Sequence, residues 1–142
     1  MFARPSFQNS VANVVGAARG IPDVSMAAAV NGGALVYLGF SGNGLPAPGW
    51  YPIGGTSEAT PLFSGVVAVA DQAAHHRLGV LGSALYGGPS GLVDITSGNN
   101  TVSFRQEDNN YTVAGFDAVP GYDMASGLGT IDGERFVAAF AH

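Results

Sequence analysis

The sequence predicts a single α/β domain, and three observations support this. Two strand-like runs, 34–39 and 50–53, are separated by a turn-rich connector. A glycine-rich turn follows the second run and leads into a long apolar stretch, 62–74, which has the length of a helix. The 142 residues suffice for one hydrophobic core and are too few for two domains of ordinary size.

The two strand-like runs predict a hairpin, and the apolar stretch after the glycine-rich turn predicts a helix. Val36 and its neighbours pair with the segment around Tyr51 in the expected hairpin. The helix after the glycine turn should run to about Arg77, with Pro61 in its first turn. Nearly every position from Leu62 to Ala70 is apolar or small, so we expect this helix to be buried on most sides.

The remainder of the chain predicts two shorter helices around a long irregular segment. A helix is expected over 81–86, and a closing helix over 132–141, with Asp132 or Gly133 at its start. Between them, 87–133 is rich in Gly, Asn, Asp and Ser and is expected to be mostly loop. Loops of this length in a compact domain usually need an additional link to hold them.

Composition narrows the classes of function. Charged residues make up only 11% of the chain and the net charge is −5, with no basic cluster, so nucleic-acid binding is not expected. Cysteine is absent, which excludes disulfides, zinc thiolates and cysteine nucleophiles. No apolar stretch reaches the roughly 18 residues of a membrane span, and the first twenty residues do not have the pattern of a signal peptide.

Ser57 stands on the glycine-rich turn, at the predicted start of the buried helix. A hydroxyl on a sharp bend is accessible, and a helix amino terminus offers N–H donors where an oxyanion would form. The same position suits an ordinary helix cap, because Ser and Thr are common capping residues. The turn alone therefore leaves two interpretations open, a nucleophile and a cap.

Five segments resemble the sedolisin family of serine-carboxyl peptidases, in the clan of the subtilisins. The segment Gly54-Gly55-Thr56-Ser57-Glu58-Ala59-Thr60-Pro61 resembles the nucleophile motif, in which the doubled glycine is typical of sedolisins. The other four, in order, are Arg19-Gly20-Ile21-Pro22-Asp23-Val24-Ser25, Leu85-Tyr86, Asp94-Ile95-Thr96-Ser97-Gly98-Asn99-Asn100 and Pro120-Gly121-Tyr122-Asp123-Met124-Ala125-Ser126-Gly127-Leu128-Gly129. Taken in this order, the five segments span most of residues 1–142.

The resemblance implies a subtilisin-like fold, a parallel sheet flanked by helices, of which this chain is the carboxyl-terminal half. It implies that Ser57 is the nucleophile, which forms an acyl-enzyme with a peptide substrate, and that its backbone N–H helps to hold the oxyanion. By family, the activity is that of an endopeptidase or a tripeptidyl peptidase working at acid pH. A secreted protein is also implied, with its signal peptide upstream of Met1.

The family's general base is a glutamate backed by an aspartate, with a second aspartate in the oxyanion hole, and all three are expected upstream of these segments. A carboxylate base suits acid pH, where a histidine is already protonated. Glu58 is adjacent to Ser57, but neighbouring helix residues point about 100° apart, so we do not expect it to be the base. His75 and His76 lie roughly 27 Å along the helix and are expected to be ordinary cations at its end.

Asp94 and Asp123 flank the loop-rich region. From the residues alone, they are either calcium ligands or acidic residues that cap loop turns. The family resemblance implies a calcium held by these two carboxylates and by the carbonyls of Ile95, Val119 and Gly121. Val119 occupies a position often filled by glycine in the family, and its carbonyl remains a suitable ligand unless the backbone there needs a positive φ.

Two functions remain open at this point. In the first, the chain is part of an active peptidase whose upstream half supplies the base. In the second, it is a non-catalytic, calcium-stabilised module descended from such an enzyme. The expected partners are a peptide substrate and the upstream half of the peptidase domain, with neither nucleic acid nor membrane.

Overall fold

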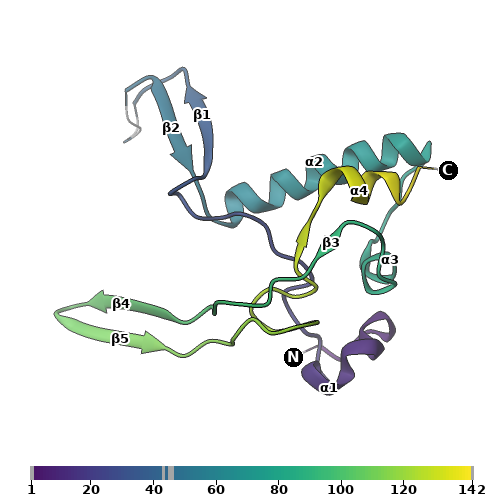
Figure 1. The fold of residues 1–142 in the computed structure, drawn as a ribbon. Helices are drawn as coiled ribbons and strands as arrows, with labels where there is room; N and C mark the ends of the chain where they lie inside the picture. Colours follow the sequence, from purple (N-terminus) through teal and green to yellow (C-terminus); the bar gives the residue numbers. More distant parts are fainter. Residues whose placement is uncertain (1, 43, 45–46, 142) are drawn as a thin grey trace. The chain divides into compact units, whose positions relative to one another are not determined.

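The structure is a computed structural model, and it describes residues 2–42, 44 and 47–141. Helices and short strands follow one another along the described residues. They are η1 (Ser6–Val11), α1 (Ala12–Val15), β1 (Ala34–Leu38), β2 (Gly49–Ile53), α2 (Thr56–Ala74), α3 (Gly82–Tyr86), β3 (Leu92–Val93), β4 (Val102–Gln106), β5 (Asn109–Val113), β6 (Thr130–Ile131) and α4 (Gly133–Ala138) (Figure 1). The chain divides into two compact units, Met26–Ala68 and Met1–Ser25 with Val69–His142.

The unit Met26–Ala68 contains the expected hairpin. Strands β1 and β2 are antiparallel, with Ala34 opposite Ile53 and Tyr37 opposite Trp50. The rings of Tyr37 and Trp50 pack edge to face, with centroids 5.4 Å apart. The hairpin prediction is therefore confirmed, although residues 43, 45 and 46 of its connector lie outside the described residues.

The helix after the glycine turn is present, but it ends at Ala74 rather than near Arg77, and it differs from the prediction in two further ways. It begins at Thr56, so Pro61 is its sixth residue and lies beyond the first turn. The expectation that the helix is buried on most sides is wrong, because Leu62 is 43% exposed and Val69 is 52% exposed. The apolar run sets helix length and hydrophobicity, whereas burial depends on which other segments cover the helix.

In the unit formed by Met1–Ser25 and Val69–His142, β3 pairs with β6, and α4 follows β6 directly. Phe136 of α4 is fully buried and packs against Phe140 with ring centroids 5.1 Å apart. The N-terminal residue of the closing helix was predicted as Asp132 or Gly133. Asp132 is the N-cap, and its Oδ1 accepts the N–H of Arg135 at 3.1 Å.

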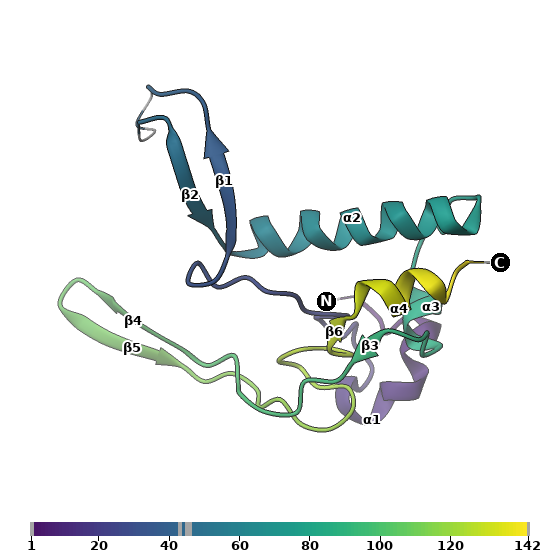
Figure 2. The same cartoon turned by 45° about the horizontal axis from the view of Figure 1, so that its top comes forward.

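A second hairpin lies in the segment that was expected to be mostly loop. Strands β4 and β5 are antiparallel, and Figure 2 shows them extending as an arm from the loops on either side. The two residues between them, Glu107 and Asp108, have φ of 47° and 65°. Two successive residues with positive φ form the type of turn that matches the twist of a two-residue hairpin. Phe104 and Tyr111 stack across the strands.

The sheet prediction needs correction. Among the described residues there are three two-stranded antiparallel sheets and no parallel sheet. Each strand pairs with one partner, so none of the crossover connections that parallel pairing requires is formed within this part of the chain. The observed fold is mixed α/β, with small antiparallel sheets. No helix of the described chain is long and apolar enough to cross a membrane.

Candidate functional site

The serine turn consists of Gly54, Gly55, Thr56 and Ser57, between the end of β2 and the first turn of α2. Gly54 approaches the neighbouring backbone so closely that a Cβ atom there would lie 2.7 Å from the nitrogen of Val30. Gly55 has a φ of 81°, and its N–H donates to the carbonyl of Ala28 at 2.5 Å. Each glycine of the doubled pair is therefore required, the first by space and the second by backbone conformation.

Ser57 is the second residue of α2 and is exposed. Within the described residues, its hydroxyl makes no hydrogen bond, so it does not act as a helix cap. Its N–H is also without a partner in this part of the chain, whereas the next two N–H groups, of Glu58 and Ala59, both donate to the carbonyl of Gly55. The hydroxyl and the free amide are thus available to a ligand at the positive end of the helix.

Pro61 changes the backbone of the same turn. A residue at this position would normally donate its N–H to the carbonyl four residues earlier, which is that of Ser57. Proline has no N–H, so the Ser57 carbonyl receives no intrahelical bond from it. This effect was not expected from the sequence, because Pro61 was predicted to lie in the first turn.

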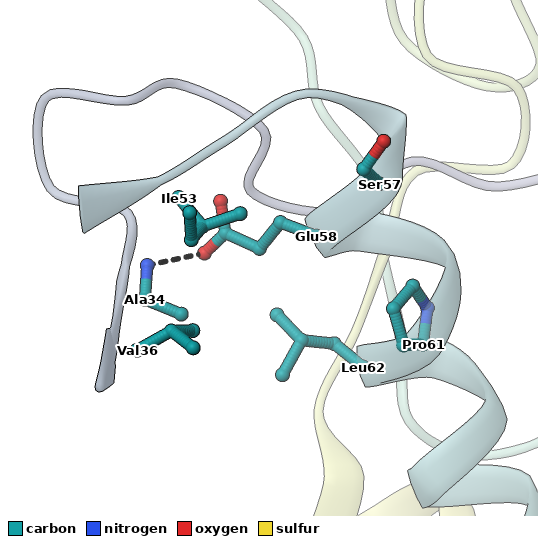
Figure 3. A pocket seen from close by; sticks show the side chains of 7 residues that line it. All are labelled: Ala34, Val36, Ile53, Ser57, Glu58, Pro61 and Leu62. Carbon is teal, nitrogen blue, oxygen red and sulfur yellow. Dashed lines mark hydrogen bonds between the residues drawn. The ribbon is translucent and has the colours of Figure 1, made fainter. Parts of the chain in front are cut away.

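Glu58 points away from the Ser57 hydroxyl (Figure 3). Its side chain lies between α2 and the hairpin, where Oε1 accepts the N–H of Ala34 at 2.7 Å. The residue is 6% exposed, and its Oε2 is buried without a hydrogen-bond partner. This geometry agrees with the expectation that Glu58 does not serve as the base for Ser57.

A cavity of about 230 Å³ lies beside the turn (Figure 3). It is formed by the inner face of the hairpin and the first two turns of α2, and its lining is mostly apolar. The lining residues are Ala34, Val36, Ile53, Ser57, Glu58, Pro61 and Leu62. The serine therefore stands at an apolar recess within one compact unit.

The two histidines were expected in the last turn of a helix that runs to about Arg77, but α2 ends at Ala74 and both histidines follow it. His75 has a φ of 58°, and Nδ1 of His76 lies 2.8 Å from the carbonyl oxygen of Ala74. Positive charge at this position would interact favourably with the carboxyl end of a helix. The contact between His76 and this carbonyl gives it a role in ending α2.

Asp94 and Asp123 are brought to the same loop. Asp94 Oδ2 accepts the N–H of Gly121 at 2.8 Å, and Asp123 Oδ2 accepts the N–H of Val119 at 2.9 Å. Asp123 is 3% exposed, and its Oδ1 also accepts the N–H groups of Ala125 and Ser126. Burial opposes ionisation of Asp123, but these N–H donors outweigh it and lower its pKa below the ordinary value.

The donor set of this loop suits calcium. Calcium binds carboxylate and carbonyl oxygens, and two carboxylates here meet one short loop. Neither carboxylate forms a salt bridge within the described residues, and Asp94 Oδ1 makes no hydrogen bond there. Val119 is not among the described non-glycine residues with positive φ, so its backbone meets the condition for a carbonyl ligand. No group of three or more His, Cys, Asp or Glu placed to hold a metal occurs in the described chain.

A buried polar network that the sequence pattern does not indicate includes Gln8, Tyr86 and Asp23. Gln8 is fully buried and donates from Nε2 to the hydroxyl of Tyr86 at 2.6 Å and to the carbonyl of Gly20 at 2.9 Å. Tyr86 donates in turn to Asp23 Oδ1 at 2.8 Å, and Arg19 pairs with the other oxygen of Asp23. Tyr86 and Asp23 both lie in segments that resemble the family, but Gln8 lies in a stretch without a clear pattern.

Comparisons with known proteins give relatives of one kind. A scan against models of protein families finds no match. The chain is 36% identical over 134 residues to xanthomonalisin of Xanthomonas sp. strain T-22, covering 92% of this chain. It is 33% identical to kumamolisin of Bacillus sp. strain MN-32 and to sedolisin of Pseudomonas sp. strain 101, over 98% and 92% of this chain.

Among solved structures, the chain matches Pseudomonas sedolisin, a serine-carboxyl proteinase complexed with two molecules of pseudo-iodotyrostatin. The TM-score is 0.74 with 32% sequence identity, over 96% of this chain and 33% of that one. The chain spans 14%, 24% and 20% of the length of xanthomonalisin, kumamolisin and sedolisin, respectively. It is therefore a homologue of the sedolisin family that corresponds to a fraction of the length of these relatives.

Proposed function

We propose that the chain supplies the nucleophile of a serine-type peptidase that hydrolyses peptide bonds at acid pH. The observation that carries this proposal is the state of Ser57, whose hydroxyl is exposed and whose N–H is unbonded within the described residues. Its relationship to the sedolisin family supports the same chemistry. An endopeptidase and a tripeptidyl peptidase both remain within the proposal.

In the proposed reaction, Ser57 Oγ attacks the carbonyl carbon of the peptide and its proton passes to a general base. The oxyanion that forms accepts a hydrogen bond from the Ser57 N–H at the start of α2. The amine then leaves with a proton, and water hydrolyses the acyl-enzyme. The base is a glutamate paired with an aspartate, which we assign to an upstream half of the peptidase domain, because Glu58 is turned away from Ser57 (Figure 3).

A bound calcium ion is the second part of the proposal. The carboxylates of Asp94 and Asp123 would hold it, together with the carbonyls of Ile95, Val119 and Gly121. Calcium would supply positive charge that links the two acidic residues and so restrains the loop. We also propose that the protein is secreted, since a calcium-stabilised domain without cysteine tolerates an extracellular environment.

The test is to express the chain alone and joined to an upstream segment carrying the Glu and Asp of a sedolisin, and to assay cleavage of a fluorogenic peptide at acid pH. We expect cleavage by the joined protein and little by the chain alone, because catalysis without a base is limited to binding and oxyanion stabilisation. Ser57→Ala should abolish cleavage, and Ser83→Ala, on α3, is the matched control.

One observation favours the second candidate, a non-catalytic calcium-stabilised module. Within the described residues, no side chain hydrogen-bonds the Ser57 hydroxyl, so nothing there activates it. A joined protein that binds calcium and folds, but leaves peptides intact, would support the module. Robust cleavage by the isolated chain would instead contradict the assignment of the base to an upstream segment.

A further inference from the structure

Glu58 has an unfavourable environment for a carboxylate. Its Oε2 is buried without a partner, and the side chain borders a recess lined by Val36, Ile53 and Leu62. Unsatisfied buried polar atoms are rare in folded proteins because each loses its hydration without compensation. A methionine or leucine would fill this space without that cost, so stability alone does not explain a glutamate here.

The other carboxylate oxygen of Glu58, Oε1, links α2 to the hairpin and so connects the two ends of the short segment that contains Ser57. Oε1 accepts the N–H of Ala34, the first residue of β1, and Ala34 is opposite Ile53 in the hairpin. From Ile53, the chain passes through the serine turn and returns to Glu58. Both ends of the turn are therefore tied to the same point on the hairpin.

Two further sets of bonds hold the turn from other directions. The N–H of Gly55 donates to the carbonyl of Ala28, and the carbonyl of Gly55 accepts from Glu58 and Ala59. The Glu58 side chain adds a hydrogen bond from α2 to the hairpin strand β1. Without it, the hydrogen bonds that hold this turn would be the backbone bonds of Gly55.

Other roles for Glu58 do not explain its burial. As a general base it would face Ser57, but the Ser57 hydroxyl and the Glu58 carboxylate point to different sides of the helix start (Figure 3). As a negative charge at the helix amino terminus, it would not need to be buried, because exposed carboxylates there also stabilise a helix. Glu134, in the first turn of α4, is an exposed residue of that kind.

We propose that Glu58 is a positioning residue, which fixes the orientation of Ser57 relative to the β1–β2 hairpin through its bond to Ala34. The inference rests on the proposed peptidase function, because the orientation of Ser57 matters for attack on a bound peptide. Displacement of a reacting group by about 1 Å can lower a rate 100-fold, so one such bond is sufficient to affect turnover.

The first experiment uses amide hydrogen exchange in the full chain to test whether the hydrogen bond between Glu58 and Ala34 restrains the serine turn. Glu58→Met removes the acceptor for Ala34, while Glu58→Gln keeps an acceptor oxygen of the same reach. We expect exchange at Gly55 and Ala59 to be roughly tenfold faster in Glu58→Met than in the native chain, and near native in Glu58→Gln. Glu58→Asp, which is too short to reach Ala34, replaces Glu58→Met if that variant fails to fold, and Glu134→Met is the matched control.

The second experiment measures turnover in the chain joined to an upstream segment that carries the Glu and Asp of a sedolisin. We expect Glu58→Met to lower kcat roughly 10- to 100-fold and to change KM less than about threefold. We also expect the thermal midpoint of Glu58→Met to be no lower than that of Glu58→Gln. Restoration of kcat by Glu58→Gln, the less stable of the two, would separate positioning from stability.

Native exchange rates at Gly55 and Ala59 in Glu58→Met, or a kcat that simply follows the thermal midpoint, would overturn the proposal. Absence of cleavage by the native joined protein would contradict the peptidase function instead. The exchange rates would then decide whether Glu58 holds the turn, since that measurement needs no activity.

Discussion

Asp123 and Glu58 are both buried carboxylates, 3% and 6% exposed, but they lie in regions that satisfy them differently. Asp123 accepts three backbone N–H groups and the hydroxyl of Ser126. Glu58 accepts one N–H and leaves Oε2 unpaired. The hydrogen bonds around Asp123 thus compensate for its burial, whereas the serine turn around Glu58 retains a buried carboxylate oxygen without compensation.

The side chains near the two carboxylates show the same contrast. Tyr122 and Ser126, beside Asp123, are buried together with it. In the unit that contains Glu58, by contrast, Leu35, Tyr37 and Trp50 of the hairpin are exposed. Exposed apolar groups of this size often mark an interaction surface, which supports a partner segment in the proposed peptidase.

The largest effect that would test this contrast is expected for Asp123→Ala. The substitution leaves the N–H groups of Val119, Ala125 and Ser126 without their acceptor, so the free energy of unfolding should fall by roughly 2–4 kcal/mol. Urea unfolding followed by circular dichroism in EDTA measures this without a metal contribution. Asp123→Asn, which keeps one carbonyl oxygen, should lose less.

Trp50 fluorescence, recorded in the same samples, sharpens the comparison. Trp50 is the single tryptophan of the chain and lies in β2, in the unit of the serine turn. A shift of the circular dichroism transition without an equal shift of the fluorescence transition would place the loss in the acidic loop's own unit. A change below about 0.5 kcal/mol by both probes would refute the stabilising role of Asp123.

A smaller effect is expected at the serine turn for Gly54→Ala. The new Cβ would lie 2.7 Å from the Val30 nitrogen and 2.9 Å from the Ala28 oxygen, which are backbone atoms. Because these atoms have to move, the free energy of unfolding should fall by about 1–3 kcal/mol, measured by urea unfolding with Trp50 fluorescence. Gly65→Ala is the control, since no atom lies within 4 Å of its Cβ and alanine favours the helix by about 1 kcal/mol. Equal effects of the two substitutions would contradict a specific constraint at Gly54.

The sequence was sufficient where the determining interactions are local. The β1–β2 hairpin, the helix after Gly55 and the cap at Asp132 follow from alternation, glycine placement and capping chemistry. The β4–β5 hairpin was missed because its turn is Glu107-Asp108, without the glycine or asparagine that usually indicates such turns. The family resemblance identified Ser57, Asp94 and Asp123 as candidates, and their roles in catalysis and calcium binding stay predictions.

Long-range contacts account for what the sequence did not show. Gln8 and Tyr86 are 78 positions apart, and nothing in the pattern around Gln8 indicates that they meet. The burial of α2 was overestimated because an apolar run does not reveal which segments cover it. The burial of Glu58 was also not predicted, since a charged residue at a helix start is ordinarily solvated.

The smallest of the predicted effects concerns Tyr86 and alkaline pH. Burial, above all, raises the pKa of Tyr86 from its ordinary value of 10.0. The folded state therefore retains a proton that the unfolded state releases, so this contribution to stability is complete below pH 10.0 and is lost as pH rises towards the folded pKa. Tyr86→Phe should cost about 1–2 kcal/mol at neutral pH, because Gln8 and Asp23 lose a partner, and should make the decline above pH 10 shallower.

Urea unfolding at a series of pH values from 7 to 11 measures both parts of this prediction. Burial also raises the pKa of Tyr122, so Tyr122→Phe should flatten the alkaline decline in the same direction, and the double variant should flatten it further. An alkaline decline as steep in the double variant as in the native chain would show that these phenols are not held neutral by the fold. Since both residues lie outside the unit of the serine turn, that result would also remove the contrast between a well-satisfied polar region and an unsatisfied carboxylate beside Ser57.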